Sequence, residues 1–440
     1  MSYRKTRIGS VFVLGVCMMA LSAPRVSAAA VQGGQPVVNA KALNGLGTLA
    51  FCWRHDVWTV RDGQVHNMGA GVLPTLSTSG RYVAYMKEGG SSSGTLWVAR
   101  TDGSGHPVAP LAKTPVTANG YVWLPGTDRL VVAASYWTLG GHGQRSHSAS
   151  KQMPSLWLVN ALTDRKTVIA SNGLVDSVAA SSDMIAYSVR RLSDVLFVDS
   201  LQPHSSPKPL VSAARAGIQL AGIAGKQVLY WVEPQHSESI AADGMVLYRI
   251  RANGGRPQSL ATTLGYPSWL SAANTSSSLY AVVGGPRLAW TGKTLRRYDL
   301  ATGTSRWIAG NTAWVALDPA ADPATGRLAF VRAANLSIKT WGFSSPGPLE
   351  TWVASRTLWV TRPGGIAPKP VAAAGYGIYR PEWTAHPDVI LYAKGRGLWL
   401  VNMSAGQPIQ VVCNVLGSTE NDQFGFYGHR FLANEYAWVP

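Results

Sequence analysis

The sequence predicts an all-β protein, an eight-bladed β-propeller made of four-stranded antiparallel sheets. One short strand pattern recurs along the chain with a spacing that is often near 40 residues. Charged residues make up only 14% of the chain, whereas about a quarter is usual in globular domains. The chain also contains 46 Gly, 26 Pro, 17 Trp and 16 Tyr. This composition is typical of many short strands joined by tight turns.

The recurring pattern is an apolar residue followed directly by an aromatic residue. Seven copies lie at Val57-Trp58, Leu96-Trp97, Leu156-Trp157, Leu196-Phe197, Leu247-Tyr248, Leu358-Trp359 and Leu398-Trp399. An eighth copy, Leu295-Arg296, keeps the apolar residue but has Arg in place of the aromatic one. If this copy is irregular, seven blades are the alternative. We expect the aromatic residue to pack between neighbouring sheets and to have no role in function.

Each copy has similar neighbours, which define a unit of four strands, a to d. An apolar run such as Ile185-Ala186-Tyr187 precedes the pattern, and a turn such as Asp102-Gly103 follows it. Four strands in about 40 residues is the period of a propeller blade. A single blade buries too little apolar surface, so blades stack around an axis.

The ends of the chain predict export and a closed ring. Residues 1–30 have the pattern of a signal peptide: Arg4, Lys5 and Arg7 precede an apolar stretch, and small residues at 26–28 or 28–30 suit cleavage. An uncleaved N-terminal anchor is the alternative and would be the only membrane attachment. We expect a linker over 31–46 and a propeller over 47–440, located outside the cytoplasm as a secreted, periplasmic or cell-surface protein.

The first copy, Leu49 to Met68, begins at strand b, so it lacks an inner strand. We expect the tail that follows Cys413 to supply this strand and close the ring. Cys52 and Cys413 lie near the two ends of the array. Strand b is inner and strand d is outer, and a disulfide requires Cα atoms within about 7 Å. Two buried thiols are therefore expected, with a disulfide as the alternative.

The stretch from Tyr379 to Tyr392 resembles the repeat of TolB-like propellers, P-x-W-S-x-D-G-x-x-I-x-Y. Residues 74–85 and 267–280 are weaker copies, and Leu96 to Gly103 is similar to the family's following strand and turn. The resemblance covers residues 47 to 413 and implies the architecture, in proteins that serve as periplasmic scaffolds or as non-catalytic parts of peptidases. We expect no hydrolase domain to follow, and so no peptidase activity.

The variable connections between strands b and c indicate where a ligand would bind, because function usually lies on loops held by a rigid scaffold. The long connections are at 137–155, 231–244, 284–294 and 333–356. The b–c connections carry seven acidic residues and thirteen basic ones, Arg54, Lys87, Arg145, Lys151, Arg190, Arg191, Arg287, Lys293, Arg332, Lys339, Arg356, Lys394 and Arg396.

Aromatic residues outside the repeat, beside cationic ones, suit stacking on sugars or peptides and contact with acidic groups. The predicted ligand-binding residues are Trp137, Arg145, Lys151, Trp231, Trp290, Lys339, Trp341 and Trp352. The alternative is that the loop tryptophans fold back into the centre of the ring.

The whole chain has a formal charge of +17, of which +4 lies in the signal segment. This excess favours an anionic partner. The expected partner is a protein or an anionic or carbohydrate polymer of the cell envelope, bound by a monomer; export excludes nucleic acid.

The sequence carries no clear catalytic motif. Its one G-x-S-x-G match, Gly90 to Gly94, lies in a Gly/Ser run between two predicted strands and not at a strand-to-helix elbow, and there is no H-E-x-x-H motif. His142 and His147 are five residues apart without a carboxylate, which makes a poor metal site. One blade, 292–307, is similar to the repeat of quinone-cofactor dehydrogenases. We expect a non-enzymatic binding module without cofactors; the alternative is a propeller enzyme, such as a glycan lyase, a lactonase or a quinoprotein, with its site in the central channel.

Overall fold

A computed structural model describes most of the chain after the N-terminal segment. The described residues are 34–87, 94–114, 116–139, 145–147, 155–161, 163, 165–170, 173–190, 193–201, 205–214, 217–233, 244–272, 277–285, 288–336, 351–404, 406–415 and 435–440. Residues Pro36–Pro440 form one compact unit. In the described part of the chain, no helix is long and apolar enough to cross a membrane.

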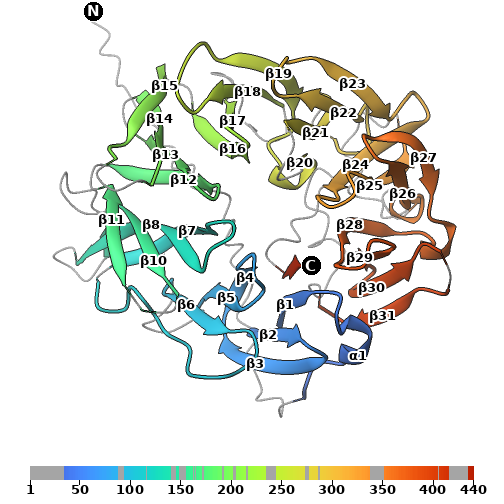
Figure 1. The fold of residues 1–440 in the computed structure, drawn as a ribbon, viewed down its shortest axis with the longest axis horizontal. Coiled ribbons are helices and arrows are strands. Elements are labelled where there is room, and N and C mark those ends of the chain that lie inside the picture. The colour runs from blue at the N-terminus through green and yellow to red at the C-terminus, as the bar shows by residue number, and fades with distance from the viewer. Residues whose placement is uncertain are drawn as a thin grey trace, which may run out of the picture. The chain divides into compact units, whose positions relative to one another are not determined.

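Eight antiparallel sheets form a ring in this unit, which confirms the predicted eight-bladed β-propeller (Figure 1). Blade 1 contains β32 (Tyr436–Val439), β1 (Thr48–Trp53), β2 (Asp56–Arg61) and β3 (Gln64–Ala70). Blade 2 contains β4 (Val72–Leu76), β5 (Tyr82–Met86) and β6 (Leu96–Arg100), with Val108 bridged to Val98 at its outer edge. Blade 3 contains β7 (Val116–Trp123), β8 (Arg129–Leu139), β10 (Leu156–Asn160) and β11 (Lys166–Ala170), with β9 (Arg145–His147) paired to β8. Blade 4 contains β12 (Leu174–Ala180), β13 (Ile185–Arg190), β14 (Ser193–Asp199) and β15 (Lys208–Ala214).

The second half of the ring repeats the same strand order. Blade 5 contains β16 (Ile218–Ala224), β17 (Gln227–Val232), β18 (Met245–Arg251) and β19 (Gln258–Thr263). Blade 6 contains β20 (Leu270–Ala272), β21 (Ser278–Val283), β22 (Thr294–Asp299) and β23 (Ser305–Ala309). Blade 7 contains β24 (Trp314–Ala321), β25 (Leu328–Ala334), β26 (Thr357–Arg362) and β27 (Ile366–Pro370). Blade 8 contains β28 (Ile378–Trp383), β29 (Val389–Lys394), β30 (Gly397–Asn402) and β31 (Ile409–Val412). Short helices include α1 (Ala40–Leu43), η2 (Pro267–Trp269) and η3 (Ala372–Ala374), and residues 351–354 are also helical.

The C-terminal strand closes the ring, as predicted. Strand β32 pairs antiparallel with β1, with Leu49 opposite Trp438 and Phe51 opposite Tyr436. It is the inner strand of blade 1, and the C-terminus lies among the inner strands (Figure 1). The Tyr436 side chain is fully buried. The first strand, β1, and the last strand, β32, therefore belong to the same sheet.

The repeat marks strand c of every blade, and its apolar residue is the main core contact. All eight of these Val or Leu side chains are at most 1% exposed, including Leu295. The aromatic residue that follows is only partly buried in most blades. In six blades the register between strands c and d shifts just between the two residues, which is the mark of a β-bulge. All seven repeat aromatics belong to, or pack against, hydrophobic clusters that join neighbouring blades, as expected, and the apolar neighbour is the more deeply buried residue of each pair.

The segment predicted as a linker lies against blade 8, where Cys413 also lies, whereas Cys52 packs between blades 1 and 2. Val38 bridges to Val412, and Leu43 of α1 is buried. Cys52 is in β1 and Cys413 directly follows β31, and neither forms a disulfide. Both thiols are half-buried rather than fully buried.

Candidate ligand-binding face

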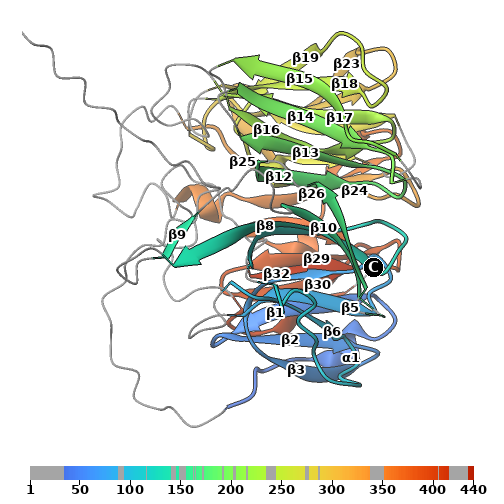
Figure 2. The same ribbon diagram turned by 90° about the vertical axis from the view of Figure 1, so that its left-hand side faces the viewer.

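The b–c connections leave the ring on one face, where β8 runs on beyond its blade and pairs with β9 (Figure 2). Several predicted binding residues lie outside what the structure describes. His142, Lys151, Lys339 and Trp341 are outside the described residues. The backbone of Trp137 lies in β8, and Arg145 and His147 lie in β9, but their side chains are outside the described part.

Three predicted binding tryptophans are core residues, and their proposed contact with a ligand is corrected. Trp231 and Trp352 are 0% exposed and Trp290 is 8% exposed. Trp231 lies within β17, because this strand runs further than the sequence pattern indicated, and its indole Nε1 donates to Thr263 Oγ1 at 2.8 Å. Trp290 and Trp352 pack edge to face, with ring centroids 5.9 Å apart. These side chains present no surface to a ligand.

Blade 7 instead places a cation between two tryptophan rings. Arg332 on β25 is paired with Ala316 on β24 and Thr357 on β26. Trp314 and Trp359 are each two residues away from those partners, and therefore lie diagonally beside Arg332 on the same face of the sheet. The Arg332 Cζ lies 4.3 Å from the Trp314 ring centroid and 4.5 Å from the Trp359 ring centroid.

The same diagonal geometry recurs in blades 8 and 2. Lys394 is paired with Gly397, and its Nζ lies 5.6 Å from the ring centroid of Trp399, two residues further on. The backbone N–H of Lys87 donates to the carbonyl of Thr95, and its Nζ lies 4.7 Å from the Trp97 centroid. Both tryptophans are the repeat aromatic of strand c. The half-buried ring of the repeat thus orients a cation at the loop end of strand b.

Blade 1 holds a variant of this arrangement. Trp53 takes the place of the cation and packs edge to face on Trp58, with centroids 6.2 Å apart. The next residue, Arg54, lies over Trp53 with its Cζ 4.5 Å from the ring centroid. Blades 7, 8, 1 and 2 follow one another around the ring (Figure 1). We call this set the cation–aromatic rim: Trp53, Arg54, Lys87, Trp97, Trp314, Arg332, Trp359, Lys394 and Trp399.

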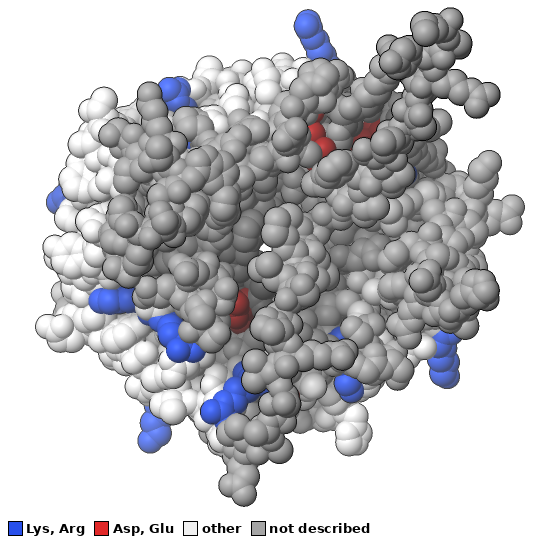
Figure 3. Space-filling model, turned by 180° about the vertical axis from the view of Figure 1, so that it is seen from behind, with Lys and Arg blue, Asp and Glu red and all other residues white. Residues whose placement is uncertain are grey.

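Within the described residues, the four cations of the rim have no carboxylate partner. None of the ion pairs formed within the described residues includes Arg54, Lys87, Arg332 or Lys394. Burial lowers the pKa of Arg332, which keeps its charge because a guanidinium is protonated at any physiological pH. Figure 3 views the molecule from the loop side and shows Lys and Arg at several places in the lower half, where blades 8, 1 and 2 lie. The rim therefore offers positive charge held in place by aromatic rings.

Carboxylates gather at a different part of the same face, on blades 4 and 5. Arg190 at the end of β13 pairs with Asp176 of β12, with 3.2 Å between Nη2 and Oδ1. Burial raises the pKa of Asp176 and of Glu233, Arg190 opposes both shifts, and Asp194 adds to them. Among the described residues, no group of three or more His, Cys, Asp or Glu side chains could hold a metal ion.

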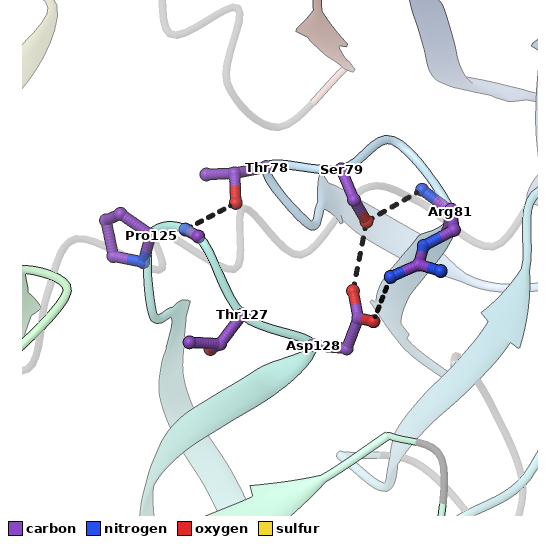
Figure 4. A pocket seen from close by; sticks show the side chains of 7 residues that line it. Thr78, Ser79, Arg81, Pro125, Thr127 and Asp128 are labelled. Atoms are coloured by element: carbon purple, nitrogen blue, oxygen red, sulfur yellow. Dashed lines mark hydrogen bonds and ion pairs between the residues drawn. The ribbon is translucent and has the colours of Figure 1, made fainter.

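A pocket of about 330 Å³ lies on the opposite face, between the a–b turns of blades 2 and 3 (Figure 4). Its polar groups bind one another: Asp128 accepts from Ser79 Oγ at 2.9 Å and from Arg81 Nη2 at 2.8 Å. Arg327 and Asp388 occupy the same positions before strand b in blades 7 and 8 and are 3.2 Å apart. These contacts join one blade to the next, which is a structural role.

Sequence reasoning counted the four rim cations in its basic excess but missed their aromatic partners. Trp97, Trp359 and Trp399 were set aside as repeat residues, and Trp314 was not singled out. The signal that could have found them is a cation at the end of strand b that precedes a tryptophan on strand c.

Comparison with known proteins finds distant structural similarity and identifies no family. No family model matches the chain and no curated protein matches it, so the TolB-like resemblance stays a prediction. The structure is similar to that of a prolyl endopeptidase, with a TM-score of 0.48 and 10% identity over 77% of this chain and 49% of that one. It is also similar to the tricorn protease, with a TM-score of 0.42 and 9% identity over 81% of this chain and 41% of that one. A third similar structure is an oligogalacturonate lyase from Vibrio parahaemolyticus, with a TM-score of 0.39 and 12% identity over 64% of this chain and 80% of that one. The chain spans about half or less of the length of these two peptidases.

Proposed function

We propose that this propeller is an exported, non-enzymatic binding module, and that its cation–aromatic rim binds an anionic polymer of the cell envelope. The observation that carries the proposal is the repetition of one cation–tryptophan pair, in one register, in blades 2, 7 and 8. Core packing accounts for the apolar residue of strand c. It does not account for a cation that lies beside the tryptophan ring and has no carboxylate partner within the described residues.

The rim suits a polymer better than a small molecule. Its cations lie on separate blades, so a ligand that meets several of them must extend along the ring. A charge held against a ring face loses less conformational freedom when it binds an anion than a mobile lysine or arginine would. Repeated weak contacts along one chain then add up to useful affinity through effective concentration.

The test is a comparison of two charge-matched variants. In the rim variant, Arg54, Lys87, Arg332 and Lys394 are replaced by Ala. In the control, four exposed cations of the a–b and c–d turns on the opposite face are replaced by Ala: Lys226, Arg251, Arg256 and Arg362. Both variants lose four positive charges, so a general effect of net charge is the same in each.

Affinity for a soluble polyanion such as dextran sulfate is measured by calorimetry at constant ionic strength. The proposal predicts a rise in Kd of about tenfold or more for the rim variant, which corresponds to at least ~1.4 kcal/mol, and a change of less than about twofold for the control. Equal losses in the two variants would show that only net charge matters, and the rim would then have no special role.

The enzyme alternative is favoured by one observation, the raised pKa of Asp176 and of Glu233 beside Arg190. Carboxyl groups with raised pKa values can exchange protons with a substrate near neutral pH. This alternative predicts that the bound polymer shortens during incubation and that Glu233→Gln stops the shortening. A polymer of unchanged length, measured by size-exclusion chromatography, supports the binding module.

A further inference from the structure

Blades 7 and 8 each have a cation beside the strand c tryptophan and an aromatic residue at, or just before, the start of strand a. In blade 7 the three are Trp314, Arg332 and Trp359. In blade 8, Lys394 is paired with Ile378 on strand a. Tyr376 lies two residues before that partner, as Trp314 lies two residues before the partner of Arg332. By position in the sequence Tyr376, Lys394 and Trp399 correspond to the blade 7 residues, although Tyr376 precedes β28 and the ring contact of Lys394 is with Trp399.

The first aromatic residue of each set is exposed. Trp314 is 36% exposed and Tyr376 is 67% exposed, which are high values for such large apolar rings. Tyr376 is held between two glycines in the left-handed region, Gly375 with φ 75° and Gly377 with φ 73°. Residues with a Cβ atom would be strained at both of these flanking positions, so glycine is favoured there.

The two sets lie next to each other. Tyr376 forms an isolated β-bridge with Thr357 of blade 7, the residue that is also paired with Arg332. A Cβ atom placed on Gly375 would lie 3.1 Å from Nζ of Lys394. The connection from blade 7 to blade 8 therefore passes close to Lys394 and to the residue that is paired with Arg332.

Two tryptophan rings pack on the guanidinium of Arg332. Both ring centroids lie within 4.5 Å of its Cζ. Within the described part of the chain, the Arg332 side chain has no ion pair or hydrogen bond. Its N–H groups form a planar fork whose geometry matches two oxygens in one plane, as in a carboxylate.

We propose that blades 7 and 8 form two successive subsites for a carboxylated polysaccharide. In each subsite the exposed aromatic ring, Trp314 or Tyr376, stacks on a sugar ring, and the adjacent cation, Arg332 or Lys394, binds the carboxylate of that sugar. This inference rests on the proposed function and adds the chemical class of the polymer. Each blade supplies one aromatic ring and one cation. This repetition fits a polymer in which every unit has a sugar ring and a carboxylate.

The experiment compares three polymers with one backbone: carboxymethyl dextran, dextran sulfate of equal charge density, and uncharged dextran. The wild-type protein is predicted to bind carboxymethyl dextran at least about fivefold more tightly than dextran sulfate, and dextran least. Arg332→Lys keeps the charge but loses the fork, and is predicted to remove this preference. The matched control Lys394→Arg, which adds a fork, should keep it. Tyr376→Ala should weaken binding of both charged polymers, whereas Ile366→Ala, which truncates an exposed apolar residue on the opposite face, should not.

The outcomes separate the two proposals. If both charged polymers bind equally well and Arg332→Lys changes nothing, the carboxylate subsites are wrong while the anionic polymer function stands. If neither charged polymer binds, the proposed function itself fails. Tighter binding of poly-glutamate or single-stranded DNA than of carboxymethyl dextran would also overturn the polysaccharide inference. The preference of the wild-type protein is measured without any variant, so a poorly folded variant leaves the test intact.

Discussion

The indole Nε1 of Trp438 donates a hydrogen bond to the backbone carbonyl of Trp383, at 2.8 Å. Trp438 belongs to the last strand of the chain, which is the inner strand of blade 1, and Trp383 ends the inner strand of blade 8. The guanidinium of Arg380 adds a second link, from Nη1 to the carbonyl of Tyr436 at 3.1 Å. The seam of the ring is thus held by pairing within blade 1 and by hydrogen bonds to blade 8.

Weakening this seam should destabilise the whole ring. Trp438→Ala removes a buried ring and its hydrogen bond, and we expect the free energy of unfolding to fall by about 3–5 kcal/mol. Gly47→Ala should act in the same direction, because its Cβ would lie 2.4 Å from the carbonyl oxygen of Val439. Urea denaturation measures the free energy of unfolding of both variants. Trp307→Ala, which truncates a ring that is 54% exposed, is the control and should cost less than about 1 kcal/mol; equal losses for Trp307 and Trp438 would contradict this role of the seam.

The two cysteines should not contribute to stability through a disulfide. Cys52 and Cys413 are separate thiols in the structure, so a reducing agent should leave the melting temperature unchanged. Thiol labelling of the unfolded mature protein should modify both residues. A melting temperature that falls on reduction, or a mass two hydrogens lower before reduction, would instead show a cross-link at the seam.

The buried amine of Lys293 should make stability depend on pH. Its side chain is 1% exposed, and burial lowers its pKa to about 7, from 10.5. Between these values the unfolded chain binds more protons than the folded one, so the free energy of unfolding should rise as the pH increases from 7 towards 10. Lys293→Met should remove this part of the rise and stabilise the protein most at neutral pH. Parallel pH profiles for the two proteins would contradict a depressed pKa.

Export predicts a defined new N-terminus. If residues 1–30 are a signal peptide, expression in a bacterium should yield an extracytoplasmic protein that begins after Ala28 or Ala30. N-terminal sequencing and fractionation check this. Replacing Ala28 and Ala30 by bulky residues should block processing and leave the protein attached to the membrane. Unprocessed wild-type protein in the membrane fraction would support the anchor instead.

Much of the fold could be predicted because the repeat requires the same core residue in every blade. The Leu295 copy illustrates this: Arg296 breaks the aromatic pattern, yet Leu295 is fully buried and blade 6 is complete. The missing strand a of blade 1 could also be predicted, since an unpaired inner strand leaves backbone groups unsatisfied.

The site could not be predicted to the same extent, because it depends on register and on the ends of strands. Trp231 was assigned to a loop, but β17 continues past it and the ring enters the core. Conversely, Trp314 and Arg332 are 18 positions apart in the sequence, and only the pairing of Ala316 with Arg332 brings them side by side. Periodicity locates strands well, whereas a diagonal contact requires the exact pairing partner.

The central claim, that the cation–aromatic rim binds an anionic polymer, is tested most directly by the salt dependence of binding. The slope of log Kd against log salt concentration counts the ions released when charges pair. We predict a clearly smaller slope for the variant lacking Arg54, Lys87, Arg332 and Lys394 than for the wild-type protein, and an unchanged slope for the variant lacking Lys226, Arg251, Arg256 and Arg362. An unchanged slope in the rim variant would contradict this claim.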